Sequence, residues 1–111
     1  MSHSDYAKNI DTNHAAIRKH IRDELHYEWV DTFRSGFGFP DAIVIARNGI
    51  PVMLEIKSPG KGQNANEIEF QERMKKAGYW FYFVVYSIDD VKQAIEHVEE
   101  YKIEVKREWS E

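Results

Sequence analysis

Two carboxylates and a lysine near the middle of this chain have the residue types and spacing to bind a divalent cation and a phosphate. Glu55 and Lys57 lie two positions apart on an otherwise apolar segment, and Asp41 begins the preceding segment. Residues i and i+2 of a strand project from the same face of a sheet. Carboxylates suit a hard cation, and a cation together with an ammonium would offset negative charge that develops at phosphorus.

The alternative interpretation of the same three residues is structural, with an Asp at a strand start and a Glu–Lys ion pair on the surface. Three features of the sequence favour a site. A hairpin pattern brings the residues together, glycine-containing segments at 35–40 and 58–63 flank them, and a helix that contains Gln71 follows directly. Burying charges in an apolar strand costs free energy, which also favours a functional role for Glu55 and Lys57.

The hydrophobic pattern predicts the elements that would position these residues. A helix from Asp11 or Thr12 to about Glu24–His26 carries an apolar stripe with a four-residue spacing. Strands are expected over 27–34, 41–47, 50–57 and 79–86, the last one central, and helices over 65–77 and 89–101. Ile103, Val105 and Trp109 are expected to form a last strand or a docking tail. The order α-β-β-β-α-β-α predicts one α/β domain, residues 1–111, with a mixed β-sheet flanked by helices.

The Asn48-Gly49 pair is a strong hairpin signal, and the register of that hairpin decides whether Asp41 lies near Glu55. A strict two-residue turn would direct Asp41 away from Glu55, because a shift of one residue moves every side chain to the other face. We therefore predict a three-residue loop of residues 48–50 that places Ile43 opposite Glu55, a bulge, or an Asp41 just before regular pairing.

Composition excludes several classes of protein. The chain has 111 residues, 15 Lys and Arg, 19 Asp and Glu, and no cysteine, so disulfides and cysteine-based metal sites are excluded. The net charge of −4 argues against coating nucleic acid through bulk charge, although local phosphate contacts are still open. The longest uncharged apolar stretch, 77–88, is shorter than the roughly 20 residues of a membrane span. With no signal-peptide pattern at its start, the chain is expected to be soluble and intracellular, with no membrane partner.

These residues, taken in order, resemble the VRR-NUC domain family of the PD-(D/E)XK nuclease superfamily. The resemblance rests on Gly38-Phe39-Pro40-Asp41, on Glu55-Ile56-Lys57, on Gln71, and on Gly78 before an apolar strand that ends at Ser87. It implies a restriction-endonuclease-like fold and a metal-dependent endonuclease that acts on branched or structured DNA. It also implies a homodimer similar to Holliday-junction resolvases, in the cytoplasm of a bacterial or phage-infected cell.

The resemblance implies roles for individual residues. Asp41 and Glu55 would bind Mg²⁺ or Mn²⁺, and Ile56 would offer its backbone carbonyl to the same ion. Lys57 would orient or activate the attacking water and stabilise the transition state. Gln71 would position that lysine or the water.

One position departs from the family pattern. His14 stands where the family usually has a Glu, so it is either an imidazole ligand that suits Mn²⁺ better than Mg²⁺, or an ordinary histidine without a ligand. This departure and the acidic composition leave two further hypotheses open. The chain could be a non-catalytic module that binds structured DNA, or a protein-interaction domain in which the apparent site is a coincidence.

Several residues outside the site could contact DNA. Four basic residues are candidates for phosphate contacts, and each could equally be a solvated surface charge: Lys61, Arg34, Lys75 and Lys76. Phe37 and Phe39 flank Gly38 in a polar loop. Either they pack at the edge of the core, or one of them projects as a wedge at an unstacked base.

Overall fold

The elements follow one another in the predicted order. The computed structural model describes residues 12–101 of the chain, so the predicted last strand at 103–109 lies outside the described residues. Helix α2 (Thr12–Arg18) continues as the π-helical segment η1 (Lys19–Glu24) and is followed by strands β1 (Glu28–Asp31), β2 (Ala42–Ile45) and β3 (Pro51–Ile56). Helix α3 (Ala65–Lys76), strand β4 (Tyr82–Val85) and helix α4 (Ile88–Glu99) come next.

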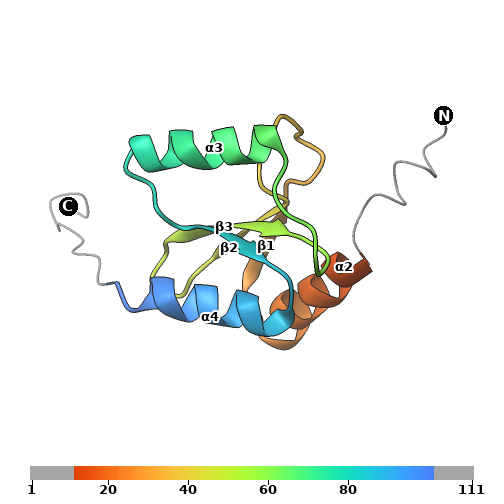
Figure 1. Cartoon of the computed structure of the whole chain (residues 1–111). Helices are drawn as coiled ribbons and strands as arrows, with labels where there is room; N and C mark the ends of the chain where they lie inside the picture. The colour runs from red at the N-terminus through yellow and green to blue at the C-terminus, as the bar shows by residue number, and fades with distance from the viewer. Residues whose placement is uncertain (1–11, 102–111) are drawn as a thin grey trace, which may run out of the picture.

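The four described strands form one mixed sheet in the order β1-β2-β3-β4. The pairs β1/β2 and β2/β3 are antiparallel, and β3/β4 is parallel. Among these strands β4 lies at an edge, which corrects the prediction of a central strand. Its unbroken apolar sequence is explained by cover on both faces, because α3 lies on one side of the sheet and α4 on the other (Figure 1). A parallel crossover through a helix makes such an arrangement possible.

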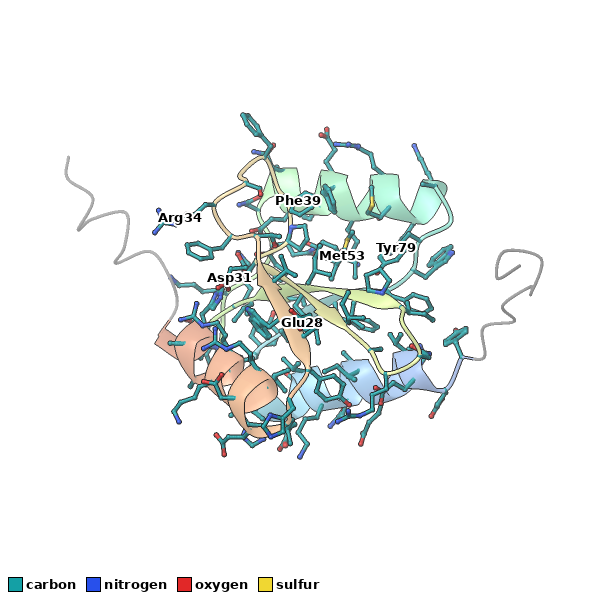
Figure 2. All side chains as sticks on the ribbon, turned by 180° about the vertical axis from the view of Figure 1, so that it is seen from behind. Glu28, Asp31, Arg34, Phe39, Met53 and Tyr79 are labelled. Atoms are coloured by element: carbon teal, nitrogen blue, oxygen red, sulfur yellow. The ribbon has the colours of Figure 1, made fainter. Side chains whose placement is uncertain are left out.

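The two faces of the sheet have different chemistry. Val52, Leu54 and Ile56 of β3 are at most 3% exposed and belong to the main core, which packs against α2 and α4. Met53 and Glu55 alternate with them and therefore face α3, as Lys57 does just after the strand. Figure 2 shows Met53 between the sheet and α3. The charged residues of the predicted site thus lie on the α3 face, away from the main core.

The N-terminal helix packs below the sheet and ends in a wide turn. Ile17 and Ile21 are its buried apolar positions, as the four-residue spacing predicts. The N–H of Leu25 donates to the carbonyl of His20 at 2.9 Å, a π-type bond, and His26 then leaves the helix with a φ of 61°. Within residues 12–101 no helix has both the length and the apolarity to cross a bilayer.

Candidate active site

Asp41 and Glu55 occupy opposing positions of the hairpin. Ala42 pairs with Leu54, so Asp41, one residue before β2, lies opposite Glu55 on the same face. Asp41 Oδ2 accepts a hydrogen bond of 2.7 Å from the N–H of Ile56, which fixes the carboxyl group beside the end of β3. The backbone carbonyl of Pro40 accepts instead from the Thr32 hydroxyl at 2.7 Å.

The hairpin loop has three residues, as predicted, but they are residues 47–49 and not 48–50. Ala46 pairs with Ile50, since the N–H of Ala46 donates to the Ile50 carbonyl at 2.9 Å. Gly49 closes the loop with a φ of 87°, a conformation that favours glycine. The predicted pairing of Ile43 with Glu55 is therefore wrong, and Ile43 pairs with Met53. Asp41 does sit just before regular pairing.

Glu55 is a buried acid among other acids. Its side chain is 2% exposed, and its Oε1 accepts a 3.0 Å hydrogen bond from the Tyr82 hydroxyl. Burial, together with the neighbouring carboxyl groups of Asp41 and Glu67, raises the pKa of Glu55 to about 10. Burial also raises the pKa of Asp41, although the bond from the Ile56 N–H opposes that rise. A protonated Glu55 donates a hydrogen bond to a neighbouring carboxylate at neutral pH.

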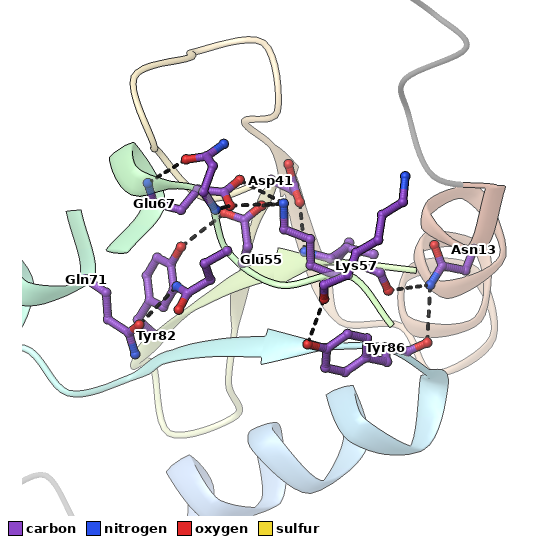
Figure 3. Close-up of polar contacts among 12 residues, drawn as sticks. Asn13, Asp41, Glu55, Lys57, Glu67, Gln71, Tyr82 and Tyr86 are labelled. Carbon is purple, nitrogen blue, oxygen red and sulfur yellow. Dashed lines mark hydrogen bonds and ion pairs between the residues drawn. The ribbon is translucent and has the colours of Figure 1, made fainter. Parts of the chain in front are cut away.

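Lys57 supplies the positive charge of this cluster. Its Nζ lies 2.9 Å from Glu67 Oε1 and 3.8 Å from Glu55 Oε2, with a side chain that is 17% exposed (Figure 3). Burial alone would lower the pKa of Lys57, but Glu67, Glu55 and Asp41 outweigh it and the pKa is raised. Lys57 is therefore an ammonium at neutral pH, directed between the strand and the first turn of α3.

Glu67 is a member of the site that the sequence analysis missed. It is the third residue of α3, and Asn64 and Glu67 form a capping box in which each side chain accepts from the other's backbone N–H, at 2.8 and 2.9 Å. Burial raises the pKa of Glu67, but bonds from Glu55, Asn64 and Lys57 outweigh it and the pKa is lowered. The Asn-x-x-Glu spacing is the sequence signal that could have placed this carboxylate at the helix start.

Gln71 lies one turn beyond Glu67 and is directed elsewhere. Its Oε1 accepts a 3.0 Å hydrogen bond from Gln63, whose amide also lies beside the Tyr82 hydroxyl. Figure 3 shows Gln71 on the far side of Tyr82 from Lys57. Glu67, and not Gln71, contacts Lys57, and Gln71 is linked to Glu55 through Gln63 and Tyr82. A role for Gln71 in positioning the attacking water stays a prediction.

Helix α2 is hydrogen-bonded to the site through Asn13, and the electrostatic interaction with His14 opposes the rise that burial causes in the pKa of Asp41. The Asn13 amide donates to the backbone carbonyls of Lys57 at 3.1 Å and Tyr86 at 3.2 Å, and it links the helix to the ends of β3 and β4. His14 is 4% exposed, with Nε2 at 3.4 Å from Asp31 Oδ1 and its ring edge-on to Phe33. These contacts match an ordinary buried histidine, and a role for His14 as a metal ligand remains a prediction.

The basic residues proposed to contact DNA are dispersed. Lys61 is exposed on the loop after β3, and its backbone carbonyl accepts a 3.0 Å bond from the Tyr86 hydroxyl. Arg34 is exposed on the loop after β1, where its guanidinium lies 5.1 Å from the Phe33 ring centre. Lys75 and Lys76 close α3, about 12 Å along the helix from Glu67 at the usual rise per residue. Lys61 and Arg34 are on the loops next to the site, and the other two are at the opposite end of α3.

The oxygens of this cluster fit a hard divalent cation. Glu55 and Asp41 are two buried carboxyl groups that repel each other when both are ionised, so Glu55 is protonated. A divalent cation would relieve that repulsion. Asp41 and Glu55 would hold the ion, with the Ile56 carbonyl as the predicted third ligand. Among residues 12–101 no three His, Cys, Asp or Glu side chains form a ready ligand set. Water or phosphate oxygens would have to complete the shell, and Mg²⁺ characteristically keeps such ligands.

Comparison with known proteins supports this interpretation of the fold. No family model matches the chain, and no curated protein matches it. A solved structure described as a VRR_NUC domain is similar, with a TM-score of 0.62 and 26% sequence identity, over 78% of this chain and 98% of that chain. The resemblance to the VRR-NUC domain family is therefore confirmed. The chain has the restriction-endonuclease-like α/β fold of VRR-NUC domains, which is a nuclease-type fold.

Proposed function

We propose that this protein is a divalent-metal-dependent endonuclease that hydrolyses phosphodiester bonds in branched or structured DNA. One observation carries the proposal: Asp41, Glu55 and Lys57 converge on one face of the sheet, at the N-terminal end of α3. Two carboxylates and an ammonium at one strand end are the groups that hydrolysis of a phosphodiester needs. The similarity to a VRR_NUC domain supports the same reaction class.

The contacts of each residue suggest its role in phosphodiester hydrolysis. A bound Mg²⁺ or Mn²⁺ would supply Lewis-acid polarisation of the phosphate and a more acidic water. Asp41 is held by the Ile56 N–H and Glu55 by the Tyr82 hydroxyl, so both carboxyl groups are oriented before any ligand arrives. Lys57 would place its ammonium against the oxygens that gain charge in the transition state, while Glu67 sets the position of that ammonium.

A homodimer in an intracellular setting completes the proposal. Dimerisation is supported by exposed aromatic residues around the edge strand β4, where Trp80 is 63% and Tyr86 37% exposed. A groove of about 450 Å³ lies alongside, between β4 and α4. Large exposed apolar side chains near a sheet edge are common at interfaces between proteins. Light scattering that finds only a monomer at working concentration would contradict this part of the proposal.

The test of the reaction is cleavage of labelled junction, flap and linear DNA in the presence of Mg²⁺ or Mn²⁺. We expect cutting of the branched substrates by the parent protein and none with a chelator. Lys57→Ala should lose at least a hundredfold in rate, as expected when one charged group at a developing negative charge is removed. Equal cleavage rates for the parent and Lys57→Ala would contradict the proposal.

A non-catalytic module that binds structured DNA is the second candidate. It is favoured by the Glu67–Lys57 ion pair, because that contact engages the one ammonium in the acidic cluster. Metal-independent binding to junctions, with no cleavage under any divalent ion, would select this candidate over the enzyme.

A further inference from the structure

Phe37 is the most exposed large apolar side chain in the described part of the protein, at 92%. The loop that carries it, residues 32–41, packs its other aromatic rings, which are partly buried, against neighbouring elements. Phe39 packs edge-on against Phe70 of α3 at 5.1 Å between ring centres, and Phe33 packs against His14 at 5.4 Å. Figure 2 shows Phe39 between the loop and α3. The loop thus has two inward aromatic anchors and one outward ring.

The backbone of this loop holds Phe37 in an unusual conformation. Gly36, Phe37 and Gly38 have φ angles of 70°, 56° and 81°, so three successive residues are left-handed. Glycine adopts this conformation readily, whereas a residue as bulky as Phe is strained there. The N–H of Phe39 donates to the Gly36 carbonyl at 3.0 Å and closes the turn. A strained backbone that displays an apolar ring to water is the kind of feature that collects at functional sites.

The loop is fixed against the candidate active site. Gly38 lies so close to α3 that an added Cβ would stand 2.1 Å from the carbonyl oxygen of Asn66, the residue before Glu67. At its other end the loop leads directly into Asp41, and the Thr32 hydroxyl ties it to the Pro40 carbonyl at 2.7 Å. The Phe37 ring therefore projects from a loop that contacts α3 beside Glu67 and then continues into Asp41.

An exposed aromatic ring on the loop that leads into the proposed phosphodiester-binding site has a chemically defined partner. A nucleobase that has left the helical stack offers an apolar face of similar size, and stacking on an aromatic side chain is largely independent of sequence. A base inside continuous duplex is already stacked on both faces and is not available without distortion.

We propose that Phe37 stacks on an unpaired or unstacked nucleobase of DNA bound at the Asp41, Glu55 and Lys57 site. This inference rests on the proposed function, and it assigns the preference for branched over continuous DNA to one side chain. Phe39 does not contribute, because it is packed against Phe70.

The experiment compares parent, Phe37→Ala and Phe37→Trp as full chains, with Ca²⁺ present to limit cleavage. The probes are a three-way junction with 2-aminopurine at the branch and a continuous duplex of the same sequence, followed by fluorescence anisotropy and 2-aminopurine emission. We expect Phe37→Ala to lose about 5- to 100-fold in junction affinity, the range found when one stacking side chain is removed, with a much smaller change on duplex. Phe37→Trp should retain junction affinity. Val30→Ala, which trims another exposed apolar side chain on neighbouring β1, should behave as the parent.

The outcomes separate this inference from the proposed function. If the parent binds and cuts junctions and Phe37→Ala does so equally well, the stacking role is wrong while the nuclease stands. If the parent binds no DNA, both fail. If Phe37→Ala reduces self-association in sedimentation while junction affinity is unchanged, the ring contacts a second copy and the inference is overturned. Misfolding is excluded by thermal unfolding, in which Phe37→Gly should be at least as stable as the parent because glycine relieves the left-handed strain. Phe37→Ala should unfold close to the parent, because alanine keeps a Cβ in the same left-handed backbone and the ring that it removes is exposed.

Discussion

The Lys57 ammonium lies 2.9 Å from a carboxylate oxygen of Glu67 on α3 and 3.8 Å from Glu55 beside it on β3. The helix thus supplies the closer partner of a lysine that the strand presents. Glu67 is also held by the Asn64 N–H, so the capping box at the start of α3 fixes the position of the ammonium. The capping of α3 therefore determines where the Lys57 ammonium lies at the end of β3.

Removal of the Glu67 charge should affect cleavage through Lys57. Glu67→Gln keeps an oxygen for the Asn64 N–H but loses the ion pair, so the pKa of Lys57 should fall from its raised value. We expect cleavage of junction DNA to fall about 10- to 100-fold, the usual cost of losing an outer-shell partner, and the alkaline limb of the pH–rate profile to move to lower pH.

The matched control is Glu69→Gln, which removes an exposed charge from the same helix turn and should leave both rate and profile unchanged. A Glu67→Gln protein with the parental rate and profile would show that Glu67 serves only to cap the helix.

Glu55 should make the metal-free protein less stable as pH rises. Its pKa is about 10 in the folded state, against roughly 4.3 for an ordinary glutamate, so between these values the folded state keeps a proton that the unfolded chain has released. Stability falls with pH wherever the unfolded state binds fewer protons. In chelator, the free energy of unfolding should decline from about pH 5 towards pH 9, as measured by urea denaturation.

Glu55→Gln should flatten that dependence and raise the free energy of unfolding at pH 8 by about 1–3 kcal/mol, because the amide cannot ionise in the buried site. Glu28→Gln, an exposed charge removal on β1, provides the comparison. A Glu55→Gln protein as pH-sensitive as the parent would mean that another group dominates the titration.

A bound divalent cation should make Glu55 stabilising, because the carboxyl group would then help to bind the ion. Mn²⁺ or Mg²⁺ that binds at Asp41 and Glu55 stabilises the folded state by mass action, by about 2.7 kcal/mol at a hundredfold excess over Kd. The measured Tm should rise with the ion in the parent and return with chelator. Asp41→Asn and Glu55→Gln should abolish the rise, and Glu96→Gln on α4 should preserve it. An equal rise in all four proteins would place the ion elsewhere.

The sequence was informative where a local pattern determines the structure. That Asp41 lies near Glu55 on one face followed from the hairpin signal and the alternation of side chains, and the helix order followed from periodicity. The hairpin loop begins one residue earlier than predicted and the strand pairing differs by two residues, because the position of the loop depends on contacts from far along the chain. The Asn48 amide donates to the carbonyls of Val98 and Tyr101 at 2.9 Å each, which draws Asn48 toward the end of α4. A sequence pattern around Asn48-Gly49 contains no trace of those partners.

The missed Glu67 has a similar cause. Its capping role was readable from Asn64-x-x-Glu67, but its contact with Lys57 depends on the angle at which α3 crosses the sheet. Gln71 was the more conspicuous residue because it matched the family pattern, yet its amide is bonded to Gln63. Local chemistry predicts where a helix starts, and tertiary packing decides which of its side chains reaches the site.

The close approach of the 32–41 loop to α3 leads to a last prediction, on stability. Gly38→Ala adds a Cβ that would stand 2.1 Å from the Asn66 carbonyl oxygen, in a residue with a φ of 81°. Overpacking and left-handed strain together should lower the free energy of unfolding by about 2–4 kcal/mol in urea denaturation. Gly36→Ala is the matched control, because its φ is 70° but nothing lies within 4 Å of the added Cβ. It should lose only the conformational part, about 1 kcal/mol. If the two variants lose equal stability, the loop is not seated on α3 as the contact at Asn66 indicates.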